Sequence, residues 1–216
     1  LRKLRPVRIV LPESRNPVGR RGECSMAQRI RRVGICGYCD GEFSVGGMTR
    51  HLSVCPSRKS AVAEAERRRG RNLSLYHLRA QDEWRKDFWL DLEIAGTATL
   101  GSLDHYLRRI WLECCGHLSM FSRRGWNSRK YDPSTRISDV FKPGAQMTHI
   151  YDFGDSSETL IRNVAVRKGK PTDPVHPVVL MARSIEPVFR VHSLRRESVV
   201  AVLRVHNRTR HMGNAL

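Results

Sequence analysis

An α+β fold is predicted by three features of the 216-residue sequence. Three cysteines and one histidine stand at short intervals between residues 36 and 55. Residues 88–94 alternate apolar and polar side chains, which is the pattern of a β-strand. Residues 147–166 contain two more strand patterns on either side of Gly154 and Asp155, a pair that suits a hairpin turn. These features predict a small ββα-type zinc finger followed by an α+β domain with antiparallel strands and one main helix.

Composition limits the class of protein. With 40% hydrophobic and 28% charged residues, the chain can form one domain of ordinary size plus a small module or tails. No apolar run reaches the roughly 18 residues that a membrane span needs. The first residues also lack the apolar segment of a secretory signal. We therefore expect a soluble, cytoplasmic protein with no membrane partner.

The formal net charge of +18 is concentrated at the two ends of the chain. Residues 1–33 carry ten Lys/Arg and two acidic side chains, and residues 188–216 carry six and one. Neither segment has a clear helical or strand period, so we expect a disordered basic extension and a disordered basic tail. Solvated tails and arms that contact phosphates are both consistent with this charge. The first methionine is Met26, and residues 1–25 are predicted to be dispensable.

The Cys/His group has the spacing of a metal site. Cys36 and Cys39 are separated by two residues. Eleven residues then precede His51, and three more separate it from Cys55. A short knuckle lets two thiolates meet one tetrahedral ion, and side chains four apart share one face of a helix. Because four ligands leave no open position, residues 34–57 are predicted to form a C2HC finger around a structural zinc ion.

The helix of this finger is poorly equipped to read DNA. With His51 at helix position seven, the three base-reading positions are Ser44, Gly47 and Arg50. Only Arg50 could contact a base well, and a single finger covers about 3 bp. We therefore predict no sequence-specific recognition, and a protein contact is an alternative role for the finger. Any nucleic-acid binding is expected to be sequence-blind and to use the Arg-rich segments around Arg31, residues 67–71 and the C-terminal tail.

A change of composition follows the finger. Residues 58–72 contain strong helix formers between residues 61 and 69, but they lack an apolar stripe wide enough to pack against a core. Gly70 then ends the helical pattern. This segment is predicted to be a charged, solvated helical linker.

Residues 73–187 have the patterns of a packed α+β domain. Strands are predicted at residues 73–81, 88–94 and 117–122, and a short helical turn at residues 137–141. Thr99 is predicted to cap a helix. The buried stripe of that helix is expected to contain Leu103, Leu107, Ile110 and Trp111. In the strand at residues 88–94, one face is predicted to carry Phe88, Leu90, Leu92 and Ile94, and the other Trp89, Asp91 and Glu93.

Several of these stretches resemble the plasmid pRiA4b Orf-three-like family. They are YHLRA, WLDLEIAGTATLGSLDHYLRRIWLECCGHLSMF, ISDVFKPGAQMTHI and YDFGDSSETLIR. The last is similar to the hairpin motif of the family, and the Cys/His segment is similar to the branch with an N-terminal finger. The resemblance covers roughly residues 34–187. It implies an α+β fold, a prokaryotic and mobile-element context, and no established activity. The chain departs from the family motif at Ser157, Glu158 and Thr159, where the family has Trp-Glu-His.

The acidic side chains of the hairpin offer an alternative function. Asp152, Asp155 and Glu158 lie near His149 in the sequence, and such a set could form an acid/base or divalent-metal group. Strand alternation, however, places Asp152 on the opposite face from His149, and Gly-Asp is ordinary turn chemistry. We therefore predict no catalytic residues and interpret the chain as a zinc-stabilised binding or adaptor module. An unrecognised enzyme that uses the hairpin acids is the alternative.

Overall fold

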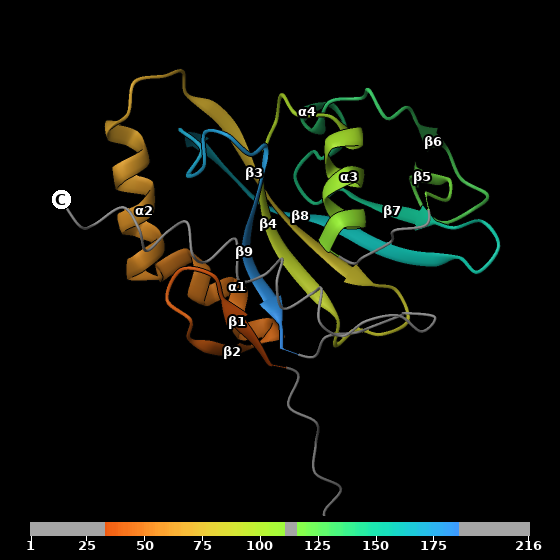
Figure 1. Cartoon of the computed structure of the whole chain (residues 1–216), viewed down its shortest axis with the longest axis horizontal. Helices are drawn as coiled ribbons and strands as arrows, with labels where there is room; N and C mark the ends of the chain where they lie inside the picture. Colours follow the sequence, from red (N-terminus) through yellow and green to blue (C-terminus); the bar gives the residue numbers. More distant parts are fainter. Residues whose placement is uncertain (1–32, 111–115, 186–216) are drawn as a thin grey trace, which may run out of the picture. The chain divides into compact units, whose positions relative to one another are not determined.

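A computed structural model describes residues 33–110 and 116–185 (Figure 1). These residues form a mixed α/β fold around a nine-stranded sheet with the order β2-β1-β9-β4-β3-β8-β7-β5-β6. The strands are β1 (Val33–Cys36), β2 (Glu42–Ser44), β3 (Leu73–Asp82), β4 (Trp89–Ala95), β5 (Ser119–Ser122), β6 (Lys130–Tyr131), β7 (Gln146–Tyr151), β8 (Ser157–Gly169) and β9 (Val178–Ser184). The helices are α1 (Val45–Val54), α2 (Pro56–Arg67), α3 (Leu100–Ile110) and α4 (Ile137–Val140).

The large antiparallel sheet and the few helices confirm the coarse fold prediction. All pairings between the described strands are antiparallel. The predicted basic tail lies outside the described residues, as does the predicted basic extension apart from Val33. None of the described helices is long and apolar enough to cross a membrane.

The main core lies between α3 and one face of the sheet. Thr99 Oγ1 accepts a hydrogen bond from the backbone N–H of Ser102 at 3.2 Å, which is the predicted cap. Leu100, Leu103 and Leu107 of α3 are fully buried. They pack on apolar side chains from several strands, and Phe141 after α4 joins the same cluster. Leu103 and Leu107 of the predicted stripe thus lie in the core and Ile110 packs against it, whereas Trp111 lies outside the described residues.

Both faces of β4 are buried, although alternation is typical of a half-buried strand. Leu90, Leu92 and Ile94 lie in the main core as predicted. The opposite face carries Trp89, Asp91 and Glu93, which are 0 to 3% exposed. This second face is covered by the segment that contains β1, β2, α1 and α2.

The predicted finger is a continuous part of the sheet. β1 pairs with β2 on one side and with β9 on the other, in a register that sets Gly34 opposite Ser184. A Cβ atom at Gly34 would collide with the Trp89 ring and the Arg183 carbonyl, so this close approach requires glycine. A second core joins the finger to the sheet, and it contains Cys36, Met48, Leu52, Cys55, Trp89, Met181 and Ala182. The predicted finger segment thus contributes two strands and a helix to one shared structure.

The predicted linker is helical and mostly exposed, but it is attached to the sheet. α2 begins at Pro56, earlier than predicted, because proline suits the first helical position. Ala65 is its one buried residue. Glu66 Oε1 accepts a hydrogen bond from Lys170 N at 2.9 Å. Arg68 Nη2 donates to the carbonyls of Pro171 and Thr172 at 2.6 and 3.1 Å. These polar contacts bind α2 to the β8–β9 connection without an apolar stripe.

Candidate metal centre

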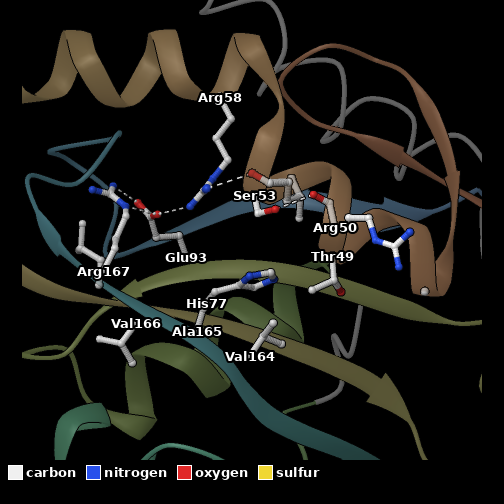
Figure 2. Close-up of a pocket in the computed structure, with 13 residues that line it drawn as sticks. Thr49, Arg50, Ser53, Arg58, His77, Glu93, Val164, Ala165, Val166 and Arg167 are labelled. Atoms are coloured by element: carbon white, nitrogen blue, oxygen red, sulfur yellow. Dashed lines mark hydrogen bonds and ion pairs between the residues drawn. The ribbon is translucent and has the colours of Figure 1, made fainter.

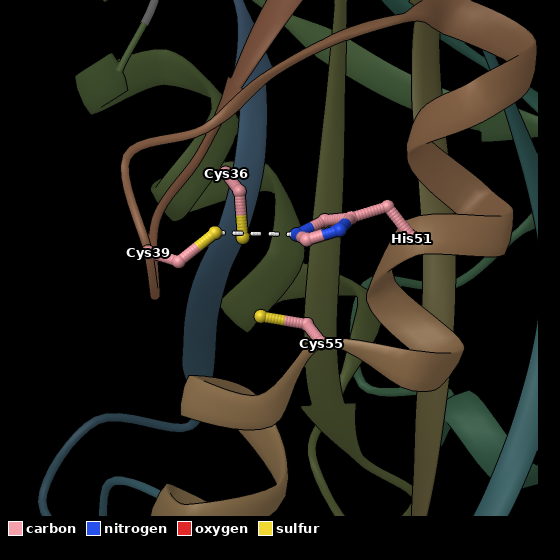
Figure 3. A group of neighbouring side chains, drawn as sticks. All are labelled: Cys36, Cys39, His51 and Cys55. Atoms are coloured by element: carbon pink, nitrogen blue, oxygen red, sulfur yellow. Dashed lines mark hydrogen bonds between the residues drawn. The ribbon is translucent and has the colours of Figure 1, made fainter.

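Four side chains of the N-terminal segment converge on one point (Figure 3). They are Cys36, Cys39, His51 and Cys55, and their ligand atoms all lie within 4.8 Å of one another. Cys39 Sγ is 3.3 Å from His51 Nε2. A tetrahedral ion with the bond lengths of zinc sets its ligand atoms about 3.5 Å apart. The structure therefore brings together the four predicted ligands in a group that could hold one metal ion.

The first two thiols lie on a tight turn after β1. The backbone N–H of Asp40 donates to Cys36 O at 2.9 Å, and Cys36 N donates to Gly41 O at 3.0 Å. Asp40 has a φ of 56°, in the left-handed region that Asp tolerates better than most residues. Gly37 N also donates to Met181 O in β9 at 2.8 Å. The turn is thus fixed both internally and against the sheet.

The other two ligands come from the end of α1. Ser44 caps the helix, because its hydroxyl accepts a hydrogen bond from Gly47 N at 3.1 Å. His51 lies in the last turn and Cys55 is the C-cap, whose N–H donates to His51 O at 2.7 Å. The ring of Phe43 stacks on His51 with a centroid distance of 3.7 Å and an interplanar angle of 17°. This stacking holds the imidazole toward the thiols.

Burial acts on the two kinds of ligand in opposite directions. Cys36 and Cys55 are fully buried, whereas Cys39 is exposed. Burial raises the pKa of Cys36 to about 11, and burial lowers the pKa of His51. Without a cation, both effects favour the neutral side chains. A divalent cation stabilises the thiolate instead, so metal binding releases protons and weakens as the pH falls.

Arg50 lines one edge of a cavity beside α1, but its side chain is exposed and points away from Arg58, Glu93 and Arg167 (Figure 2). Gly46, Thr49, Arg50 and Ser53 line this cavity together with His77 of β3. The other two predicted reading positions are poorly suited to base contact, because the Ser44 hydroxyl is used as the helix cap and Gly47 has no side chain. Of the three predicted reading positions, Arg50 is therefore the one whose side chain is exposed and could contact a base.

The acidic side chains of the hairpin have separate partners. His149 Nε2 lies 2.7 Å from Asp104 Oδ1 in α3, whereas Asp152 Oδ2 lies 3.0 Å from His117 Nδ1. Burial alone would raise the pKa of Asp104, but hydrogen bonds from His149 and Ser119 and nearby positive charge lower this pKa to about 2. His149 and Asp152 thus do not act on one point, in agreement with their predicted opposite faces.

Sequence reasoning missed a layer of buried charge beneath α1 and α2. Asp91 lies between His77 and Arg79, with Nε2 of His77 at 2.8 Å and Nη2 of Arg79 at 2.6 Å. Glu93 accepts two hydrogen bonds from Arg167, at 2.9 and 2.7 Å. Both acids were on the predicted polar face of β4. Trp89 lies on the same face of β4 as Asp91 and Glu93. A large apolar side chain among these acids was the indication in the sequence that this face is buried.

Comparisons with known proteins give few matches. No family model matches the chain, and no curated protein matches it. A crystal structure of a protein of unknown function from Methanosarcina mazei Go1 is similar, with a TM-score of 0.43 and 18% sequence identity. The similarity covers 51% of this chain and 69% of that chain. The resemblance to the plasmid pRiA4b Orf-three-like family therefore stays a prediction.

Proposed function

We propose that the four converging side chains hold one structural zinc ion and that the protein is a zinc-stabilised binding or adaptor module. The observation that carries the proposal is the distance of at most 4.8 Å between the ligand atoms of Cys36, Cys39, His51 and Cys55. Three thiols and one imidazole favour zinc over magnesium or calcium, which prefer oxygen ligands. Four protein ligands fill a tetrahedral ion, so the metal stabilises the fold and does not meet a substrate. The prokaryotic, mobile-element context implied by the family resemblance belongs to the same proposal.

The proposal predicts about one equivalent of zinc in protein that is purified under reducing conditions without added metal. Metal analysis by inductively coupled plasma mass spectrometry measures it. Cys39→Ser should lower the zinc content strongly, because serine is a poor zinc ligand. Cys24→Ser is the matched control, since Cys24 lies outside the ligand set, and it should retain the metal. A fresh, reduced sample without zinc would contradict the proposal.

A binding role is better supported than catalysis at the hairpin. Among the residues that the structure describes, the Cys/His group is the cluster of side chains with metal-ligand geometry. Asp152 and His149 belong to separate ion pairs. Asp155 is exposed at the turn. An acid/base pair needs two groups within reach of one reacting atom, and these side chains lack that arrangement.

Any nucleic-acid contact is proposed to be electrostatic and sequence-blind. Arg67, Arg69 and Arg71 are exposed along or just after α2, whereas Arg68 is held by two backbone carbonyls. Replacing the three exposed arginines with glutamine should lower the salt dependence of binding to random duplex DNA. The slope of the logarithm of the binding constant against the logarithm of the salt concentration should decrease in magnitude by up to about one for each phosphate that an arginine no longer neutralises. Fluorescence anisotropy across a salt series measures this slope.

The comparison variant for this experiment is Arg50→Ala, because Arg50 is the one predicted reading position that could contact a base well, and its side chain is exposed. We expect this variant to leave both the affinity and the slope nearly unchanged. Selection from random duplexes should enrich no motif. If a motif were enriched and Arg50→Ala abolished that enrichment, the finger would instead be established as a DNA reader. If the binding affinity did not change with salt concentration, nucleic acid would be excluded as a partner.

A further inference from the structure

One strip of the sheet face that the predicted finger segment packs on is left uncovered. Cross-strand pairing sets four side chains in one row on this face, namely Asp91 of β4, Arg79 of β3, Arg162 of β8 and Gln146 of β7. Asp91 and Arg79 are buried, and Arg79 donates to the carbonyl of Val45 in α1. Arg162 and Gln146 are exposed. The cover that α1 provides therefore ends between β3 and β8.

The β5–β6 connection covers the same face on the other side of the strip. Gly125 N in this connection donates to the side chain of Thr148 in β7 at 3.1 Å. Thr148 pairs with Leu160, which is two residues from Arg162 and therefore shares its face. Figure 1 shows β5, β6 and the β7–β8 hairpin away from α1 and α2. The uncovered strip thus runs along β8 and the start of β7, between α1 and the β5–β6 connection.

The exposed charges of this strip are positive. Arg162 is directly opposite Arg79, and like charges in this position destabilise a strand pair. Asp91 binds Arg79 through both oxygens and so does not compensate Arg162. Lys130 of β6 is exposed on the same face. Neither Arg162 nor Lys130 has an ion pair with a residue that the structure describes. Glu158 is the one acidic residue that β7 and β8 place on this face, so positive charge remains in excess.

An exposed aromatic pair borders the strip. Trp126 follows Gly125 in the β5–β6 connection, and its ring lies edge-on to that of Phe153, with centroids 5.0 Å apart and an interplanar angle of 73°. The two side chains are 36% and 42% exposed. Gly125 has a φ of 62°, in the left-handed region that favours glycine, and its hydrogen bond to β7 fixes the backbone beside Trp126. A ring held in this way offers a stacking face and loses little freedom when a ligand binds.

The width of the strip favours an extended single strand over a duplex. The strip is about two strands wide, which is on the order of 10 Å. The major groove of B-DNA alone is about 12 Å wide, so a whole duplex is wider than the strip. Proteins bind single strands with positive charge along the backbone and with aromatic rings on which bases stack. An acidic peptide would use the positive charge but leave the aromatic pair without a role.

We propose that this strip binds a single-stranded nucleic acid. Arg162 and Lys130 contact phosphates, and a base stacks on Trp126. The phosphates supply the counter-charge that Arg162 lacks beside Arg79. Because every base has an aromatic face, the contact accepts any sequence. The site uses neither the zinc ligands nor the arginines of α2, so it goes beyond the function proposed above.

Fluorescence anisotropy of the full chain with a labelled oligothymidylate of about ten nucleotides tests the proposal. The comparison ligands are a DNA duplex of the same length and polyglutamate. We expect the single strand to bind at least about fivefold more tightly than the duplex, although the duplex has twice as many phosphates, because only unpaired bases can stack on the ring. A duplex that binds as tightly as the single strand would overturn the proposal. Polyglutamate that displaces the labelled strand as well as unlabelled oligothymidylate does would overturn it in favour of an acidic protein partner.

Substitution of Trp126 tests the stacking contact. Trp126→Leu should weaken oligothymidylate binding at least about fivefold, whereas Trp126→Phe keeps a ring and should retain most of the affinity. Stacking should also quench the emission of Trp126, and Trp126→Phe should remove this part of the quenching. Because the side chain is 36% exposed, both variants should keep a melting temperature close to that of the wild type. A Trp126→Leu variant with wild-type affinity would contradict the stacking contact.

A pair of arginine variants locates the phosphate contact. Arg162→Gln should weaken oligothymidylate binding at least about fivefold. It also removes a like charge opposite Arg79, so the protein should lose no stability. Arg136→Gln is the matched control, because Arg136 is an exposed residue at the start of α4, which packs on the main core and lies outside the strip. This control should keep the wild-type affinity, and equal weakening by the two variants would show that the strand does not bind at this strip.

Discussion

Replacing Cys55 with serine is expected to release the metal and to unfold the segment around α1. Cys55 is fully buried and lies where α1 ends and α2 begins, so it is both a ligand and a part of the second core. Serine is a poor ligand for zinc. Structural zinc contributes on the order of 10–16 kcal/mol in apparent binding free energy to isolated finger peptides. This makes the metal the largest single stabilising interaction proposed for the segment.

The expected readout of this variant is the environment of Trp89. This side chain is 0% exposed and packs in the second core with Met48 and Leu52 of α1. When the segment unfolds, the indole meets water, so tryptophan emission should shift to longer wavelength. Stripping the wild-type protein with a chelator should give the same shift. The main core should retain α3, because its residues belong to a separate cluster.

Cys24→Ser is the matched control for these measurements, because it removes a thiol outside the proposed ligand set. It should leave both the emission spectrum and the thermal unfolding transition unchanged. If the metal-free wild-type protein kept the spectrum and the melting temperature of the metal-loaded protein, zinc would have no structural role in this fold.

The features that the sequence predicted well depend on neighbouring residues. The proximity of Cys36, Cys39, His51 and Cys55 follows from intervals of two, eleven and three residues within one short segment. The α3 helix follows from the Thr99 cap and an apolar stripe, and the β7–β8 hairpin follows from two strand patterns around a turn. Each of these signals is contained in a window that local periodicity can read.

The features that the sequence did not predict depend on residues that are distant along the chain. β1 pairs with β9, and nothing in either segment specifies that partner. Because of that pairing, the predicted finger segment covers one face of β4. This is the face that carries Trp89, and it is therefore buried. The attachment of α2 through Glu66 and Lys170 was also invisible, because isolated charges usually indicate a solvated surface. The cavity arises from these same long-range contacts.

The buried layer under α1 gives the second large expected effect. Asp91 is 0% exposed and binds the guanidinium of Arg79 through both oxygens, at 3.0 and 2.6 Å. Arg79 is itself 4% exposed, donates to the carbonyl of Val45 at the start of α1, and lies 4.9 Å from the Trp89 ring centroid. Asp91→Asn leaves this buried cation without a counter-charge. The free energy of unfolding should fall by about 3–5 kcal/mol.

Urea unfolding of the metal-loaded protein measures this change. Asp155→Asn is the matched control, because Asp155 is exposed, and its effect should stay within about 0.5 kcal/mol. The double variant Arg79→Met with Asp91→Leu removes both charges and should recover much of the stability, because apolar side chains of similar volume often replace a buried ion pair without loss. A double variant no better than Asp91→Asn would show that the loss does not come from the unpaired arginine.

The dependence on pH gives a separate check on the role of Asp91. Its pKa is lower in the folded protein than its ordinary value, because hydrogen bonds from His77 and Arg79 outweigh the effect of burial. A lowered folded pKa adds stability above the unfolded pKa of about 3.9, and this stability is lost as the pH falls through the folded value. The difference in unfolding free energy between wild type and Asp91→Asn should therefore be full at neutral pH and shrink in acid. A difference that stays constant down to acid pH would mean that the charge of Asp91 is not what stabilises the layer beneath α1.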